Sequence, residues 1–520
     1  MLSRFIRCTL LSLTLVMNPV SSAEAPLWFA AGRPTPEAQQ VVELLLSAGR
    51  EGLEPRDYAA QTLQQKLTQV QMGAVLSDAE QSQLDAALTA ALQHYLADLQ
   101  AGRVDPRQIH ANFSLPRHPR LDAVKLREAL AAHRLAEFVR QTAPPLPMYA
   151  SLQQALARYR ELANQPAWQL ALAPLPGRKL VAGQAYAGLP VLAQRLQALG
   201  DLASGVEVPA LLEGALLKAL QAFQERHGLA PDGVLGQDTL LALNTTPAAR
   251  ARQIELSMER LRWTPFLQVP RMIVVNVPEF VLRAYEVRDR QVDVRLTMKV
   301  IVGKALSTRT PLMDEDMRFI EFSPYWNVPP SIARKELVPH LLRDAGYFER
   351  EGFEFVSGSG QVVNTLSAES LDAVLHAGWR IRQRPGPKNA LGDIKFVFPN
   401  NDNIYLHHTP APKLFERSRR DFSHGCIRVE DPVALAQFVL HDEPVWTEER
   451  IRQAMEKGES STLRLAQPLP VLIAYSTVLV KKGRVFFYAD LYGHDRLLEQ
   501  ALRQHSASLT GAPASKPVAK

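Results

Sequence analysis

Apolar residues recur every three to four positions through the first third of the chain. Over residues 36–162 the sequence is rich in Ala, Leu and Gln, and its clearest stripe includes Leu84, Leu88 and Leu92. This spacing places apolar side chains on one face of an α-helix. The pattern therefore predicts a helical domain, which we assign to residues 36–185.

A second apolar pattern, broken by glycines, occupies residues 188–246. One apolar helix ends at Gly200, another runs to Phe223, and Gly233 and Gly236 mark turns beyond it. Glycine is common at helix C-termini and in tight turns because it adopts backbone conformations that other residues avoid. The pattern predicts a compact unit of short helices.

Apolar and polar positions alternate after about Pro265, which is typical of β-strands. A turn at Lys482 and Gly483 predicts a hairpin near the end of this region. The strands expected from the alternation span residues 272–277, 280–285, 292–302, 471–480 and 485–488. The fold class is therefore α+β and multidomain, with a β-rich domain over residues 268–500.

An insertion with helical character interrupts this β-rich domain at about residues 331–378. Arg334 and Lys335 are followed by the apolar Leu337 and Leu341, which predicts an amphipathic helix. We interpret the insertion as a lid. Residues 505–520 contain many Ser, Ala, Pro and Lys and are expected to form a disordered tail.

The composition fits a folded protein of several domains, since 46% of the 520 residues are hydrophobic and 22% are charged. The net charge of +6 favours a polyanionic partner, either nucleic acid or a wall polymer rich in carboxylates. Apart from Arg417, Arg419 and Arg420, the basic residues are dispersed rather than clustered. This dispersion argues against nucleic acid.

The first 23 residues resemble a secretory signal peptide. Arg4 and Arg7 precede a largely apolar run over residues 9–17, and small residues follow at a candidate cleavage site ending at Ala23. The alternative, a membrane anchor, needs about 20 apolar residues, roughly twice the length of this run. Cleavage removes Cys8 and leaves Cys426 as a lone thiol in an exported protein, which predicts either an inert buried cysteine or a reactive one.

The neighbours of Cys426 favour the reactive interpretation. Ser423, His424 and Gly425 precede it directly, and His407 lies nineteen residues upstream at the end of an apolar run. A thiol that attacks an amide needs a base, a group that orients the base, and donors for the oxyanion. His407 is the candidate base, a backbone carbonyl can orient it, and the amides of Gly425 and Cys426 are expected to be free for the oxyanion.

A zinc site is the main alternative for this region, because His407, His408, His424 and Cys426 are all ligand types. Structural zinc sites usually show paired short spacings on two limbs, whereas only one thiolate is present here. We therefore predict no metal and no cofactor. The side chain of His408 is interpreted as an ordinary exposed loop histidine.

The sequence resembles the L,D-transpeptidase family with a YkuD-type catalytic domain, in particular its large proteobacterial members. The motif Ser-His-Gly-Cys with an upstream His is the family signature. The resemblance covers residues 36–495, and the other phrases that carry it lie at residues 52–58, 98–106, 325–330, 384–392, 395–400 and 490–493. It implies a helical scaffold domain, a three-helix peptidoglycan-binding domain over residues 188–246, and a β-rich catalytic domain with a helical lid.

The resemblance also implies a role for each site residue. Cys426 would be the nucleophile, His407 the proton acceptor and donor, and the backbone carbonyl of His408 the group that orients His407. The remaining roles are shaping of the oxyanion loop by Ser423, His424 and Gly425, binding of a substrate carboxylate by Arg428, and walls for the donor peptide from Trp326 and Tyr405. The sequence departs from the family at His408, where related proteins often carry Asp.

The implied reaction transfers an acyl group from a peptidoglycan tetrapeptide stem, through a thioester, to an amine that becomes part of a 3-3 cross-link. The rivals are a wall peptide hydrolase or carboxypeptidase with the same residues, and a non-catalytic wall-binding scaffold. The other expectations are a periplasmic location, a monomeric state, contacts with wall-synthesis proteins, no nucleic acid, and acylation of Cys426 by carbapenems.

Overall fold

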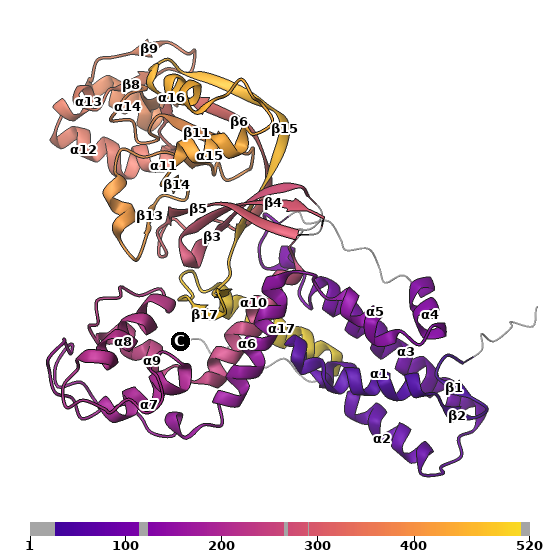
Figure 1. Cartoon of the computed structure of the whole chain (residues 1–520). Helices are drawn as coiled ribbons and strands as arrows, with labels where there is room; N and C mark the ends of the chain where they lie inside the picture. Colours follow the sequence, from indigo (N-terminus) through magenta and orange to yellow (C-terminus); the bar gives the residue numbers. More distant parts are fainter. Residues whose placement is uncertain (1–25, 114–122, 265–268, 290, 511–520) are drawn as a thin grey trace, which may run out of the picture.

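A computed structural model describes residues 26–113, 123–264, 269–289 and 291–510 (Figure 1). The predicted signal peptide, including Cys8, lies outside these residues. Within them, no helix combines the length and the apolar character needed to cross a membrane. The described chain is helical in its first half and β-rich in its second, which confirms the α+β multidomain class.

The N-terminal helices pack around an apolar core of their own. Helix α3 begins at a capping box in which Ser77 and Glu80 satisfy each other's backbone N–H groups. Its predicted stripe is buried, and Leu88 and Leu92 have no exposed surface. The elements of this region are β1 (Phe29–Ala30), β2 (Arg33–Pro34), α1 (Pro36–Leu46), α2 (Ala60–Gln71), α3 (Asp78–Ala101), α4 (Ala123–Ala131), α5 (Leu135–Thr142) and α6 (Pro147–Leu162).

The next unit contains three helices, α7 (Leu189–Leu199), α8 (Gly214–Arg226) and α9 (Gln237–Asn244). Gly200 ends α7 with a φ of 82°. The buried amide of Gln224 accepts a hydrogen bond from the Gly233 N–H at 2.8 Å and donates to the Val234 carbonyl at 2.9 Å. One side chain of α8 thus holds the glycine turn that leads into α9.

Helix α10 (Pro247–Arg262) connects this unit to the β-rich domain and packs along α6. Tyr149 of α6 shares a core with Ile254 and Met258 of α10. The hairpin of β16 (Val478–Lys481) and β17 (Arg484–Phe487) packs against the same core. The N-terminal helices, the three-helix unit and the β-rich domain therefore meet around α10 (Figure 1).

The β-rich domain is built on a nine-stranded sheet that closes on itself. Its order is β13-β5-β14-β12-β11-β6-β15-β3-β4, and β4 also pairs with β5. The long strand β5 makes this closure by pairing with β4 in its first part and with β14 and β13 in its last. The strands are β3 (Arg271–Asn276), β4 (Val281–Arg288), β5 (Gln291–Gly303), β6 (Met313–Phe322), β11 (Ile394–Val397), β12 (Leu406–His407), β13 (Asp421–Ser423), β14 (Ile427–Val429) and β15 (Ser461–Ala474). Helices α15 (Pro432–Val439) and α16 (Glu448–Glu456) pack beside it.

The hairpin predicted near the C-terminus is confirmed, with Lys482 and Gly483 in the left-handed conformation between β16 and β17. The prediction of a single strand over residues 471–480 is wrong. This segment divides between β15, which ends at Ala474 in the large sheet, and β16, which begins a separate two-stranded sheet at Val478. Both pieces alternate in the same way, so local periodicity did not reveal the break between them.

The insertion contains the predicted amphipathic helix, which runs through α11 (Pro330–Ile332), a π-helical turn (Ala333–Leu337) and α12 (Val338–Arg343). Pro339 lacks an N–H and crowds the preceding turn, which is a physical reason for the wide π-turn just before it. The insertion is longer than the predicted residues 331–378, because a sheet of order β7-β10-β8-β9 that the sequence did not predict extends it to residues 326–383. Its further elements are β7 (Trp326–Asn327), α13 (Gly346–Arg350), β8 (Phe353–Val356), β9 (Val362–Val363), α14 (Ala368–His376) and β10 (Arg380–Gln383).

The predicted disordered tail begins too early in the sequence. Helix α17 (His494–Thr510) continues past residue 505 and buries Leu498 and Leu502. Ser506 is also buried, and its hydroxyl donates a hydrogen bond to Asp57 at 2.9 Å. The Ser- and Ala-rich composition hid this helix, because small residues suit a helix that packs closely on another part of the chain. Residues 511–520 lie outside the described residues.

Candidate active site

The loop that carries Cys426 joins β13 to β14 and is held by buried hydrogen bonds. The Ser423 hydroxyl donates to the Cys426 carbonyl at 2.5 Å, and the Thr310 hydroxyl donates to the Gly425 carbonyl at 2.7 Å. Gly425 has a φ of 119°, and a Cβ there would lie 3.3 Å from Ile404. The positive φ favours glycine at this position, and a Cβ would also press against the end of the Ile404 side chain.

The expectation that both loop amides are free for an oxyanion is wrong for one of them. The Gly425 N–H donates to the Ser423 hydroxyl at 3.2 Å, so it is engaged within the loop. The Cys426 N–H remains the backbone candidate. Ser423 thus acts on the shape of the loop from both ends, through the Gly425 amide and the Cys426 carbonyl.

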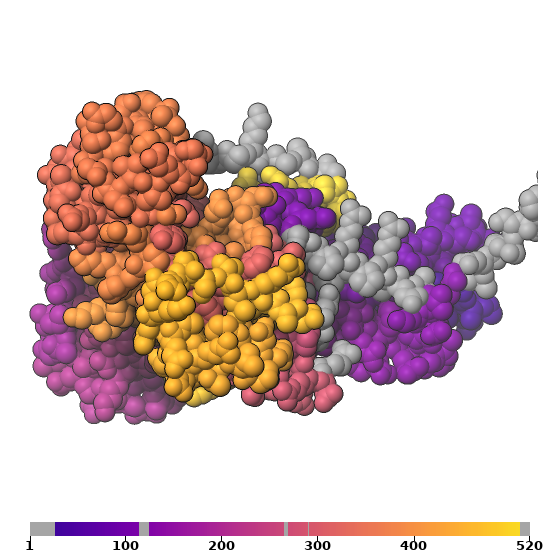
Figure 2. All heavy atoms as spheres, turned by 90° about the horizontal axis from the view of Figure 1, so that it is seen from above, coloured from indigo at the N-terminus to yellow at the C-terminus, as the bar shows by residue number. Residues whose placement is uncertain are grey.

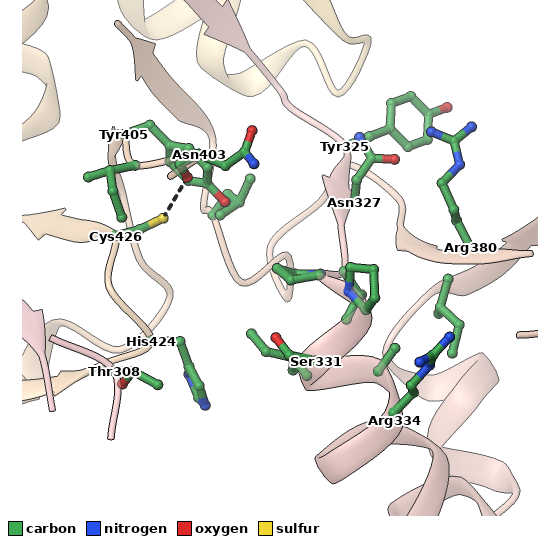
Figure 3. A pocket seen from close by; sticks show the side chains of 18 of the residues that line it. Thr308, Tyr325, Asn327, Ser331, Arg334, Arg380, Asn403, Tyr405, His424 and Cys426 are labelled. Atoms are coloured by element: carbon green, nitrogen blue, oxygen red, sulfur yellow. Dashed lines mark hydrogen bonds between the residues drawn. The ribbon is translucent and has the colours of Figure 1, made fainter. Parts of the chain in front are cut away.

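Cys426 is half-buried, and its thiol faces a cavity. The sulfur lies 3.5 Å from the carbonyl oxygen of Asn403, to which the S–H donates (Figure 3). Burial raises the pKa of the Cys426 thiol, and contact with Tyr405 and the charges of Lys395 and Arg428 partly oppose this effect. The resting site therefore holds a neutral thiol.

His407 lies on β12, which pairs in parallel with β14 in the register Leu406 to Ile427 and His407 to Arg428. Alternate residues of a strand share a face, so Tyr405 and His407 lie on the face that carries Arg428. The Arg428 charge acts on both His407 and Cys426. The sheet thus brings the histidine and the cysteine loop together, although His407 is buried and does not line the cavity.

The protonation state of His407 follows from its contacts. Its Nδ1 lies 2.5 Å from the carbonyl oxygen of His408, and since a carbonyl only accepts, Nδ1 carries the proton. Nε2 is left with the lone pair that a base needs. Burial, followed by the charge of Arg428, lowers the pKa of His407 to about 3. The ring is therefore neutral at physiological pH.

The cavity has a volume of about 520 Å³ and lies between the closed sheet and the insertion (Figure 3). The closed sheet and its loops supply Thr308, Lys395, Tyr405 and Cys426, and the other residues that line the cavity come chiefly from the insertion, among them Asn327, Pro330, Ser331, Arg334 and Arg380. The insertion forms a separate lobe beside the rest of the domain (Figure 2).

Two side-chain contacts at the cavity were not predicted, one between the insertion and the cysteine loop and one within the closed sheet. Nε2 of His424, in the cysteine loop, lies 2.7 Å from a carboxylate oxygen of Glu336 in the insertion. Lys395 on β11 pairs with Glu321 at 3.0 Å and holds its ammonium 4.5 Å from the centre of the Tyr405 ring, at the edge of the cavity. Lys395 and Glu336 carry no sequence signal of their own, since surface strands and helices usually carry such residues.

Two of the residues predicted to bind substrate, Trp326 and Arg428, do not line the cavity. Trp326 packs in the core of the insertion, 6.4 Å from the Phe353 ring, while its neighbours Tyr325 and Asn327 line the cavity. Arg428 is half-buried and outside the lining, and its Nε has no hydrogen-bond partner among the described residues. Trp326 faces away from the cavity because adjacent residues of a strand point to opposite sides of the sheet.

The side chain of His408 is half-buried rather than exposed. Its Nδ1 lies 3.3 Å from the Asp393 carboxylate, and its ring covers Gly392 so closely that a Cβ on this glycine would lie 2.6 Å from it. An Asp at this position would place a second carboxylate beside Asp393, whereas the His408 ring adds no negative charge there.

Comparisons with known proteins agree with this architecture. Residues 21–156 match the scaffold domain, residues 187–243 match a domain described as "Putative peptidoglycan binding domain", and residues 270–447 match the L,D-transpeptidase catalytic domain. The chain therefore carries an L,D-transpeptidase catalytic domain together with scaffold and peptidoglycan-binding domains.

One relative is a Haemophilus influenzae (strain Rd) protein named "Putative L,D-transpeptidase", 33% identical over 252 residues. The match covers 48% of this chain and 49% of the relative, so it spans about half the length of each. A solved structure, a fused Zn-dependent amidase/peptidase/peptidoglycan-binding protein from Clostridium acetobutylicum, covers 57% of this chain and 99% of its own at 10% identity and a TM-score of 0.18. A likeness this weak carries no argument about fold or function.

Proposed function

We propose that the protein is a peptidoglycan L,D-transpeptidase in which Cys426 is the nucleophile and His407 the base. The observation that carries this proposal is the pairing of β12 with β14, which brings His407 beside the loop that carries Cys426, with the thiol at a cavity and the imidazole oriented by a backbone carbonyl. The matched catalytic domain supports the same reaction class.

In the first step His407 Nε2 accepts the thiol proton while the sulfur of Cys426 attacks the carbonyl carbon of the third stem residue. Negative charge moves to the carbonyl oxygen, near the Cys426 amide. The intermediate then collapses, the bond to the terminal D-alanine breaks, and the departing amine takes the proton from His407. The products are a thioester and free D-alanine.

The pKa values shape this step. A raised thiol pKa and a His407 pKa of about 3 disfavour a stable thiolate and imidazolium pair in the resting site. The proton must therefore move as the sulfur attacks, when the forming bond makes the thiol more acidic. A buried, neutral pair also keeps the thiol unreactive toward oxidants until a substrate arrives.

In the second step an acceptor amine attacks the thioester carbonyl and gives its proton to His407. The carbon–sulfur bond breaks, and the sulfur of Cys426 regains the proton. When the amine belongs to the side chain of a neighbouring third residue such as diaminopimelate, the product is a 3-3 cross-link. Water in place of the amine gives a shortened stem, which is the carboxypeptidase alternative.

The charge of the cavity fits a stem peptide rich in carboxylates. Arg334, Arg380 and Lys395 line it, against one carboxylate, Asp402. Basic groups around an open cavity attract an acidic ligand and orient it. We assign the binding of stem carboxylates to these three residues rather than to Arg428, which lies outside the lining.

The protein acts on the cell wall, in our proposal, after export to the periplasm. The peptidoglycan-binding domain would hold the enzyme at its polymeric substrate. The scaffold domain would set the position of the catalytic domain and present a surface to other wall-synthesis proteins.

The test is mass analysis of products from a purified disaccharide-tetrapeptide. The wild type is expected to release D-alanine and form a cross-linked dimer, Cys426→Ala to form neither, and His407→Ala to react about two to four orders of magnitude more slowly, the usual contribution of a positioned base. His408→Asn is the matched control, since the proposed role of residue 408 uses its backbone and the amide adds no charge beside Asp393; it should stay within a few-fold of the wild type.

Each other outcome identifies a rival. Tripeptide without dimer would show a hydrolase with the same residues. If the wild type forms neither a thioester nor a product, the remaining interpretation is a non-catalytic wall-binding scaffold. Full activity in Cys426→Ala would place the nucleophile elsewhere.

A further inference from the structure

A cluster of metal-ligand types lies far from the cysteine loop, where helix α17 crosses the scaffold helix α3. His94 and Asp98 come from α3 and His505 from α17, more than four hundred residues later in the chain. One ligand atom from each of the three lies within 4.8 Å of those from the other two. No residue of the cysteine motif belongs to this cluster.

The geometry on α3 suits a metal ion. His94 and Asp98 are four residues apart and therefore project from one face of the helix. Nε2 of His94 lies 3.4 Å from Oδ2 of Asp98. Two ligands of a tetrahedral zinc ion, each at about 2.0–2.1 Å from the metal, are separated by about 3.3 Å. The pair already has the spacing of two zinc ligands, and His505, whose ligand atom lies within 4.8 Å of theirs, is the third ligand of the candidate site.

His505 supplies an independent sign of a missing ligand. Its Nε2 is buried and has no hydrogen-bond partner among the described residues. An imidazole nitrogen in this state forfeits a hydrogen bond that water would have given it. A metal ion bound to the ring would satisfy a nitrogen that the other described residues leave unpaired.

The surroundings would support the ligands. The Tyr58 hydroxyl donates to Oδ2 of Asp98 at 2.8 Å, and the Tyr58 ring packs edge-on against His94. Hydrogen bonds of this kind orient ligating carboxylates in metal sites. The nearby positive charge of Arg103 is balanced by Asp57 at 3.6 Å and by Glu259 at 3.9 Å.

The protonation states agree with metal binding. Burial lowers the pKa of both His94 and His505, so both rings are neutral and have a lone pair for a metal. Burial also raises the pKa of Asp98 to about 7. A cation at this place would stabilise the carboxylate that burial otherwise disfavours. The side chain of His94 is 29% exposed, which leaves a path for the ion.

We propose that His94, Asp98 and His505 bind a zinc ion, with water as the fourth ligand, and that this ion fastens helix α17 to the scaffold helix α3. The ion would tie the segment that follows the catalytic domain to the N-terminal domain. Its role is structural, because no substrate-lining residue lies in the cluster.

The experiment is calorimetric titration of the full-length, metal-free protein with zinc chloride, repeated with Co²⁺ and followed by visible absorption. The wild type is expected to bind one equivalent of zinc with micromolar or tighter affinity and to show the absorption bands of tetrahedral Co²⁺. His505→Ala and His94→Gln should each weaken binding at least tenfold and lose these bands.

Two controls locate the ion. His376→Ala removes a histidine that also pairs with a carboxylate one helical turn away, Asp372 at 2.8 Å, but has no third ligand; it should bind zinc as the wild type does. Cys426→Ala should also bind normally. Absence of zinc binding, unchanged binding in both His505→Ala and His94→Gln, or loss of binding in Cys426→Ala would each overturn the proposal.

Discussion

Thr310 offers a direct test of how the cysteine loop is held. This residue has no exposed surface, and its hydroxyl accepts from the Gly303 N–H at 2.9 Å while donating to the Gly425 carbonyl at 2.7 Å. Thr310→Val keeps the shape of the side chain but removes the hydroxyl. The substitution therefore leaves one buried donor and one buried acceptor without their partner.

The expected loss follows from these two groups. An unsatisfied buried backbone group costs about 1–3 kcal/mol, so the pair costs about 2–6 kcal/mol before any relaxation. The Gly425 carbonyl keeps a second lone pair that can find another donor, which reduces the expected loss to about 2–4 kcal/mol. At 1.4 kcal/mol for each factor of ten, this corresponds to about 30-fold to 700-fold more frequent opening of the loop.

Hydrogen exchange of peptides that cover β13 and β14 measures this opening directly. Thr310→Ser is the matched control because it keeps the hydroxyl and loses one buried methyl group, worth about 1 kcal/mol. Thr310→Val should exchange much faster than Thr310→Ser, and its rate of thioester formation should fall with it. Equal exchange in the two variants would refute the idea that the hydroxyl holds the loop.

Three further predictions concern the active site and the lid. Because His407 keeps a pKa of about 3 in the folded protein and about 6.5 when unfolded, the unfolded state binds its proton first; the melting temperature should fall as pH drops from 6.5 toward 3, with a flatter dependence in His407→Gln. A carbapenem should add one adduct to the wild type in intact-protein mass spectrometry and none to Cys426→Ala; an adduct on the variant would point to another nucleophile. Hydrogen exchange over residues 331–378 should slow when a donor analogue binds, and Glu336→Gln, which weakens the contact with His424, should speed it in the free enzyme; exchange unaffected by the ligand would argue against a lid.

Much of the fold could be predicted from the sequence because periodicity is a local property. The stripe of Leu88 and Leu92 marked the buried face of α3, and alternation marked the strands near Ile273 and Val300. Turn chemistry at Lys482 and Gly483 predicted the hairpin. In each case neighbouring residues carry the whole signal, so no knowledge of distant contacts was needed.

The local nature of these signals also explains which predictions were wrong. The break after Ala474 and the direction of Trp326 depend on which sheet each strand joins, and strands of either sheet alternate alike. Helix α17 extends past His505 because it packs against α3, a contact that composition does not encode. Tertiary packing decides these points, since it selects the partner of each apolar face.

The candidate site likewise has features that the sequence predicts and features that only the tertiary structure shows. The sequence alone identified Cys426 and the histidine nineteen residues before it, because the motif and its spacing are linear features. Only the tertiary structure showed that Thr310 and Ser423 hold the loop and that the insertion links to it through Glu336. Hydrogen bonds between residues far apart in the chain form only after the sheet has closed, and this is why no local pattern could predict them.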